Sequence, residues 1–171
     1  MKKNFAPLLL GRDLRSISRS REVVRSVTDQ QDFDELFNLL LHHERLLVMR
    51  AADAIEKITA TNRKFLAPHK KQLLTLLKST VHLELKWHLA LLVSRLDLGA
   101  DELREVWGNL TYWALNPNES KIVRVNALQG LFELSGQFPV FSDSFQDILR
   151  MLEHEQIPSL QARIKRLRKA R

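Results

Sequence analysis

One amphipathic stretch, residues 47–58, constrains the fold most, because versions of it recur three times further down the chain. Its apolar side chains are separated by steps of three and four residues: Val48, Ala51, Ala52, Ile55 and Ile58. This spacing places them on one face of an α-helix. Equivalent positions in the later copies are Leu92, Leu131 and Leu167, so the copies lie about 36 to 39 residues apart, a length typical of repeats built from two helices.

A second apolar helical run precedes each copy, at residues 33–41, 73–77, 103–113 and 145–152. The predicted unit is therefore a helix A, a turn and a helix B. Neither helix buries its apolar stripe alone, so the units are expected to stack side by side. A plain helical bundle is the structural alternative.

Two segments carry a family resemblance. The sequences Val-Met-Arg-Ala-Ala-Asp-Ala-Ile at 48–55 and Ile-Val-Arg-Val-Asn-Ala-Leu at 122–128 resemble the opening of helix B in HEAT repeats, a family of armadillo-type α-solenoids. The resemblance extends from about residue 29 to the C-terminus. The second copy departs from it at Trp87 and its neighbours, and the fourth copy is mostly basic. Pattern and resemblance together predict an all-α fold, a short right-handed α-α superhelix (solenoid) of about four HEAT-like helical pairs.

The charge of the chain is uneven, although its net value is +7. Residues 1–28 contribute +5 and residues 159–171 contribute +6, whereas the body between them carries −4. We therefore expect a basic N-terminal arm and cap helix over residues 1–28, followed by a repeat domain over 29–171 that ends in a basic cap helix. The chain has no cysteine, and its longest apolar run, at 89–93, is too short to cross a membrane. These features predict a cytoplasmic protein without a membrane span.

Several polar and glycine residues have predicted local roles. Thr28 and Asp29 are suited to cap the first helix A, with Gln31 and Asp32 placed to answer from its first turn. Gly99 is expected as a left-handed C-cap. Gly130 lies inside a helix, where it either permits a close helix approach or leaves an open spot on the surface.

No catalytic or metal-binding pattern emerges. Glu84 and His88 share a helical face, but no second such pair exists, and the metal and nucleophile motifs are absent. No catalytic residue, metal or cofactor is therefore predicted. HEAT-like DNA alkylpurine glycosylases carry a Trp and an Asp four residues apart on one helix, whereas Trp87, Trp107 and Trp113 are followed at that distance by Leu, Thr and Pro.

The resemblance to HEAT repeats implies that the B helices line the concave side. The side chains expected on this concave face are Arg50, Asp53, Lys57, Trp87, Asn126 and Gln129, with Ala90, Ser94, Glu133, Ala162, Lys165 and Lys169 beside them. Trp87 is the best single candidate for a binding anchor, and packing against a neighbouring helix is its alternative. Trp107 and Trp113 are expected in the core.

The leading functional prediction is a non-catalytic scaffold that binds a protein or peptide on the concave helix-B surface. The alternative is a nucleic-acid binder, possibly related to the alkylpurine glycosylases, with polyanion contacts from the last helix: Arg163, Lys165, Arg166, Arg168 and Lys169. The same residues also suit a solvated cap. A third interpretation, a subunit or folding accessory, predicts an exposed apolar patch. The sequence carries no signal for an oligomeric state.

Overall fold

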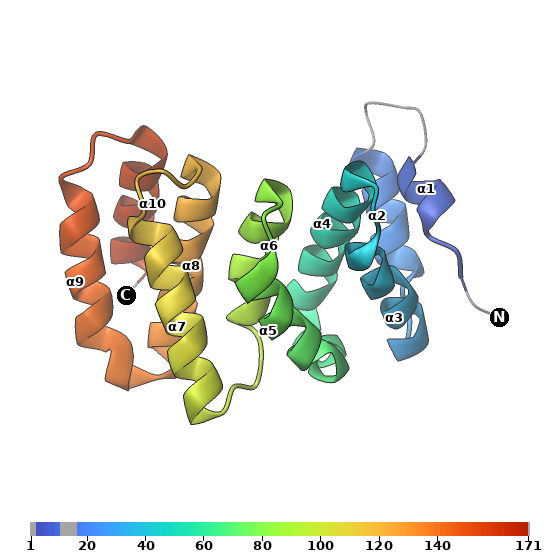
Figure 1. Ribbon diagram of the computed structural model, residues 1–171, viewed down its shortest axis with the longest axis horizontal. Coiled ribbons are helices and arrows are strands. Elements are labelled where there is room, and N and C mark those ends of the chain that lie inside the picture. Colours follow the sequence, from blue (N-terminus) through green and yellow to red (C-terminus); the bar gives the residue numbers. More distant parts are fainter. Residues whose placement is uncertain (1–2, 11–16, 171) are drawn as a thin grey trace. The chain divides into compact units, whose positions relative to one another are not determined.

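The computed structural model describes residues 3–10 and 17–170 of the chain. Within these residues all regular structure is helical, with ten α-helices and three short 3-10 helices (Figure 1). The all-α prediction is confirmed, and the succession of packed helices is that of a HEAT-like helical solenoid. The chain forms two compact units, residues 1–70 and 71–171. The predicted boundary between residues 28 and 29 stays a prediction.

Unit 1 is built around one long helix, α4. Its elements are α1 (Ala6–Leu10), α2 (Ile17–Ser26), α3 (Gln30–Asn38), the 3-10 helix η1 (Leu39–Leu41), α4 (Arg45–Thr61) and the 3-10 helix η2 (Arg63–His69). Helices α1, α2 and α3 all pack on α4. The five predicted stripe residues of α4, from Val48 to Ile58, are buried. The first amphipathic copy is therefore the core helix of this unit.

A polar cluster fixes the start of α3, as the sequence predicted. The Asp29 side chain accepts a hydrogen bond from the amide of Asp32 at 2.8 Å. The Asp32 carboxylate in turn accepts from both the amide and the hydroxyl of Thr28, each at 3.0 Å. Lys3 completes the cluster, since its ammonium lies 2.6 Å from the Asp32 carboxylate and 2.6 Å from the carbonyl oxygen of Ser26. The cluster ties the N-terminal segment to the first helix A.

The Asp32 cluster predicts an acid-dependent loss of stability. The hydrogen bond from Lys3, followed by that from the Thr28 amide, lowers the pKa of Asp32 below its usual value of 3.8, although burial opposes the shift. Asp32 therefore binds a proton less readily in the folded state than in the unfolded chain. Its contribution to stability is complete well above pH 3.8 and is lost as the pH falls through the lowered pKa. Urea unfolding followed by circular dichroism is expected to show a shallower acid dependence for Asp32→Asn than for the wild type. Asp101→Asn, at a 95% exposed side chain, should leave the wild-type dependence unchanged, and an equal flattening in both variants would contradict the assignment.

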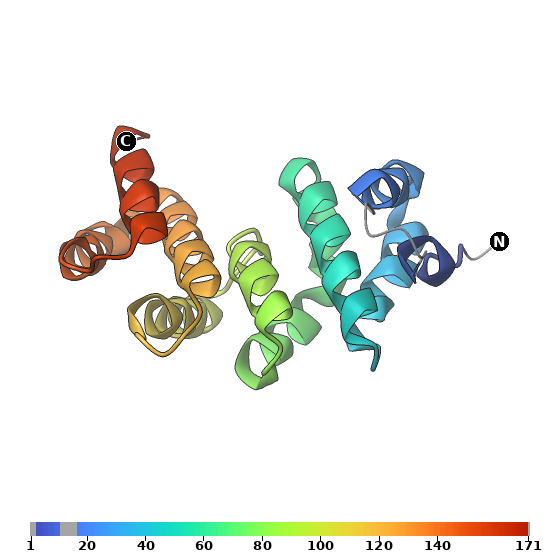
Figure 2. The ribbon, with the colours of Figure 1, turned by 90° about the horizontal axis from the view of Figure 1, so that it is seen from above.

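Unit 2 contains the remaining helical pairs. Its elements are α5 (Lys70–Ser79), α6 (Leu83–Val93), α7 (Ala100–Leu115), α8 (Lys121–Gln137), the 3-10 helix η3 (Pro139–Phe141), α9 (Ser142–Glu153) and α10 (Pro158–Lys169). Figure 2 shows α7 and α9 in one layer and α6, α8 and α10 in the other. Helix α8 packs against α6, α7, α9 and α10. The second segment with a HEAT-like opening is therefore the central helix of this unit.

The predicted core positions of Trp107 and Trp113 are confirmed, and one glycine prediction is wrong. Trp107 and Trp113 are 8% and 4% exposed, so both belong to the core. Gly99, however, has a φ of −69° and lies at the N-cap of α7. Its amide donates to the Glu102 carboxylate at 2.8 Å. This bond to the acidic first turn fixes Gly99 at the start of α7. Gly99 therefore does not serve as a left-handed C-cap of the preceding helix.

Gly130 permits a close approach between α8 and α6. A Cβ at this position would overlap the carbonyl oxygen of Ala90 and would lie 3.0 Å from Cδ1 of Leu110. Ala90 is completely buried, although the sequence analysis placed it on the exposed face of its helix. Of the two roles considered for Gly130, the close helix approach is therefore the one found.

Candidate surface of the B helices

Three predicted surface residues of unit 1, Arg50, Asp53 and Lys57, already contact the N-terminal helices or each other. The Arg50 guanidinium donates to the carbonyl oxygen of Leu9 in α1. The Asp53 carboxylate accepts a hydrogen bond from the hydroxyl of Ser20 in α2 at 2.7 Å and pairs with Lys57 on its own helix. This face of α4 is therefore a contact surface for α1 and α2.

In unit 2 the B helices α6, α8 and α10 bring together the other three predicted residues. Trp87 is half-buried, and its ring meets that of His88 edge to face, with 5.4 Å between the ring centroids. The Asn126 side chain donates to the Trp87 carbonyl oxygen at 3.3 Å. The side-chain amide oxygen of Gln129 accepts a hydrogen bond from the Arg163 guanidinium of α10 at 2.7 Å. We call this group of Trp87, Asn126, Gln129 and Arg163 the B-helix surface.

A second polar row runs beside the B-helix surface and lies deeper. Ser94 is fully buried and donates to the Glu133 carboxylate at 2.7 Å. Glu133 also accepts from the side-chain amide of Gln129 at 3.2 Å. Burial lowers the pKa of Arg163, as does the neighbouring positive charge of Arg166, whereas Glu133 opposes the shift. Arg163 is therefore a half-buried cation that donates to an amide oxygen and lies in the field of the Glu133 carboxylate.

The five basic residues of α10 are used in different ways. Arg163 contacts Gln129 across the interface with α8, and Arg168 pairs with Glu153 of α9. Lys165, Arg166 and Lys169 are exposed. In the part of the chain that the structure describes, no carboxylate pairs with any of these three. We call Lys165, Arg166 and Lys169 the cationic face of α10.

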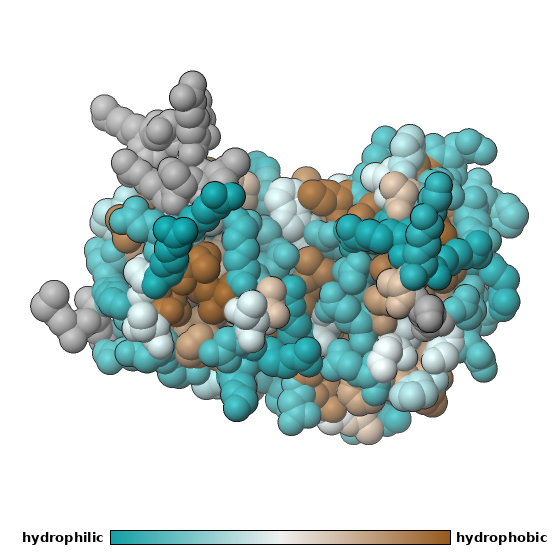
Figure 3. Space-filling view, turned by 180° about the vertical axis from the view of Figure 1, so that it is seen from behind, coloured by the Kyte–Doolittle hydropathy of each residue, from teal (hydrophilic) through white to brown (hydrophobic). Residues whose placement is uncertain are grey.

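Large exposed hydrophobic residues are scattered over several elements. They are Leu41, Leu46, Val81, Tyr112, Ile122, Val140 and Met151. In Figure 3 hydrophilic residues predominate on the visible face, with hydrophobic residues in separate areas between them.

Arg124 is a buried charged residue whose burial was not predicted from the sequence. Its side chain is 1% exposed, and its Nη2 lies 2.6 Å from the Glu155 carboxylate. Its Nε donates to the carbonyl oxygen of Ala114 at 2.9 Å. The position of Arg124 in the motif at 122–128 was the available signal. This arginine joins three segments of unit 2 and is not exposed to a ligand.

Comparison with known families decides the class of the protein. The family model described as HEAT repeat domain matches residues 12–171. The chain belongs to the HEAT repeat family. The match begins ahead of the predicted start at residue 29, so it includes α2 of the N-terminal segment. A search of curated proteins and a search of solved structures found no match.

Membership of the HEAT repeat family gives the coarse functional class. HEAT repeats generally form non-catalytic helical scaffolds that mediate protein interactions. Across residues 3–10 and 17–170, no helix is both long and apolar enough to cross a membrane. Within the same residues no three histidine or acidic side chains gather in a way that could hold a metal ion.

Proposed function

We propose that this HEAT repeat protein is a non-catalytic scaffold that binds a protein or peptide partner on the B-helix surface of unit 2. The main support is the meeting of Trp87, Asn126, Gln129 and Arg163 on three successive B helices. Tryptophan and arginine are the residue types that most often dominate binding energy at protein interfaces. Here a half-buried indole and a half-buried guanidinium lie beside the amide side chains of Asn126 and Gln129.

The first helical pair contributes less to this proposed surface. Arg50, Asp53 and Lys57 already contact α1, α2 or each other. A partner would have to displace the N-terminal helices to reach them, and that displacement would cost the hydrogen bonds now made. We therefore restrict the proposed binding surface to α6, α8 and α10. A cytoplasmic location remains part of the proposal and rests on composition alone.

Replacing Trp87 tests the proposal. The immobilised full chain would be used to capture partners from a cell extract, in parallel with Trp87→Ala and Tyr112→Ala. Tyr112 lies on α7, in the other helix layer of unit 2, and is 65% exposed. The Trp87→Ala variant is expected to reduce capture of the partner about tenfold or more, as for an interface anchor, whereas Tyr112→Ala should leave capture unchanged.

Circular dichroism would verify that both variants are folded. Capture that is equal for the wild type and Trp87→Ala, or lost only in Tyr112→Ala, would contradict binding on the B-helix surface.

A further inference from the structure

The cationic face of α10 consists of three exposed, closely spaced positive charges, which a solvated helix cap does not require. Lys165 and Lys169 are four residues apart, and Arg166 and Lys169 are three apart, so all three are neighbours on the helix surface. Like charges at such spacings destabilise a helix. The helix dipole offsets part of this cost near the C-terminus. An anionic partner would relieve the remaining repulsion.

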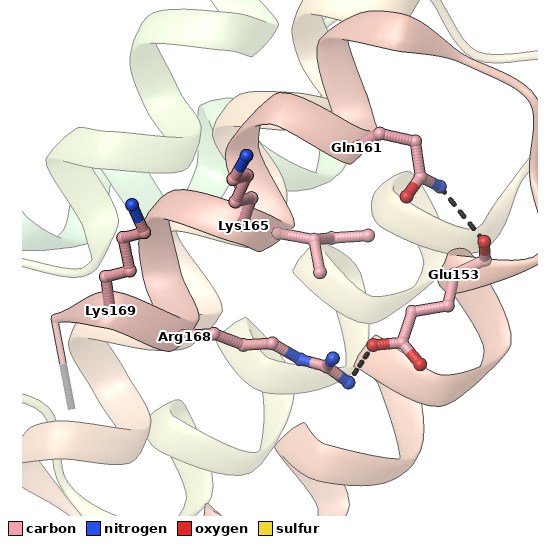
Figure 4. Close-up of a pocket in the computed structure, with 6 residues that line it drawn as sticks. Glu153, Gln161, Lys165, Arg168 and Lys169 are labelled. Atoms are coloured by element: carbon pink, nitrogen blue, oxygen red, sulfur yellow. Dashed lines mark hydrogen bonds and ion pairs between the residues drawn. The ribbon is translucent and has the colours of Figure 1, made fainter.

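A groove lies directly beside this face, between α9 and α10. Its volume is about 400 Å³, and its lining residues are Glu153, Gln161, Ile164, Lys165, Arg168 and Lys169. Figure 4 shows Arg168 reaching towards Glu153, while Lys165 and Lys169 project away from that ion pair. Among the described residues that line the groove, Glu153 has the only carboxylate, and Arg168 neutralises it. The two lysines are left to meet a ligand.

The polar groups of the lining narrow the class of ligand. Ile164 is 3% exposed and belongs to the core beneath the groove, and Gln161 is held by three backbone carbonyls, those of Leu152, Glu153 and Glu155. The side chains left for a ligand are therefore the lysines, and a ligand that fits must carry negative charge. A protein segment rich in acidic residues has this property.

The short extent of the cationic face distinguishes this ligand from a nucleic acid. The cationic face is confined to a single helix of 12 residues. A phosphodiester backbone carries continuous negative charge and is usually held along a longer basic track.

We propose that the groove between α9 and α10, with the cationic face of α10, binds an acidic segment of a protein partner. The acidic side chains pair with Lys165, Arg166 and Lys169. This inference rests on the proposed scaffold function, because it names the chemistry of the partner that the scaffold would hold.

Binding of defined peptides to the full chain tests the inference. The probe is a fluorescein-labelled peptide of four Glu-Glu-Leu repeats, and the comparison peptide has four Gln-Gln-Leu repeats. A 12-nucleotide oligo-dT serves as the polyanion control. Fluorescence anisotropy is expected to give an affinity for the acidic peptide about tenfold or more above that for the glutamine peptide and above that for oligo-dT.

A charge-matched pair of variants locates the binding. Lys165→Glu with Lys169→Glu is expected to weaken binding of the acidic peptide about tenfold or more. Arg63→Glu with Lys64→Glu changes the net charge equally at two exposed residues of η2, and it should alter binding less than about twofold. Lys165→Gln with Lys169→Gln removes the charges without reversing them and should give an intermediate loss.

Three results would overturn the inference. Equal weakening by both charge-reversed pairs would indicate a general electrostatic effect, and absence of binding by the acidic peptide would exclude the site. Tighter binding of oligo-dT that is lost with Lys165→Glu and Lys169→Glu would assign the groove to nucleic acid. Each of these leaves the Trp87-dependent capture of a partner unaffected, so failure of this inference is distinguishable from failure of the scaffold function.

Discussion

Replacing Gly130 by alanine is expected to lower the free energy of unfolding of unit 2 by about 2 kcal/mol, the range found for overpacked cores. The new Cβ would collide with the Ala90 carbonyl oxygen and crowd Leu110. A backbone carbonyl has no rotamer that could relieve this collision, so α6 and α8 would have to separate. In an unconstrained helix the same change stabilises by about 1 kcal/mol. The expected sign is therefore opposite to that of helix propensity.

The chain offers matched controls for this prediction. Gly136 lies on the same helix and Gly108 on α7, and a Cβ added at either meets nothing within 4 Å. Gly136→Ala and Gly108→Ala should be neutral or stabilising by up to about 1 kcal/mol. All three tryptophans are in unit 2, so urea unfolding followed by their fluorescence reports this unit. A Gly130→Ala variant as stable as Gly136→Ala would refute the close approach of α6 and α8.

Replacing Arg124 by alanine is expected to cost unit 2 about 3 kcal/mol, as when one partner of a buried ion pair is removed. The change leaves the Ala114 carbonyl without its donor and the Glu155 carboxylate without its cation. It also opens a cavity, because Arg124 is among the largest fully buried side chains of the described residues. Glu155 is 31% exposed, so water can partly solvate it. For that reason we place the cost at the lower end of the range for buried pairs.

Arg150 provides the comparison, because it pairs with Asp147 on the surface of α9. The two side chains are 69% and 54% exposed, and surface pairs of this kind contribute less than about 1 kcal/mol. Tryptophan fluorescence in urea would therefore separate Arg124→Ala from Arg150→Ala by at least about 2 kcal/mol. Equal stabilities would show that the contacts of Arg124 contribute little to the fold.

The helices themselves could be predicted because their apolar residues repeat with helical spacing. The stripe from Val48 to Ile58 specified the buried face of α4, and the motif at 122–128 specified the start of α8. Caps with a local hydrogen-bond logic, such as Asp29 with Asp32, were also predictable, since their partners lie within one turn. The capping role of Gly99 was not predictable, because a single glycine suits either end of a helix and the contact that decides its role comes from Glu102.

The candidate surface was only partly accessible to sequence reasoning. Helical spacing placed Trp87, Asn126 and Gln129 on the polar side of their helices, but it could not reveal the contact between Gln129 and Arg163. It also could not separate the paired cation Arg168 from the cationic face of α10, because that difference depends on the position of Glu153 on a neighbouring helix.

Arg50 and Arg124 show which features the sequence determines and which depend on the tertiary structure. Arg50 and Arg124 stand at similar places in similar segments, so sequence by itself determined that both open a B helix. Tertiary structure alone decided their partners: a carbonyl oxygen of α1 for Arg50, and Ala114 with Glu155 for Arg124. The physical reason is that periodicity orients a side chain relative to its own helix axis, whereas charge pairing, burial and close approach depend on which other helices pack against that side.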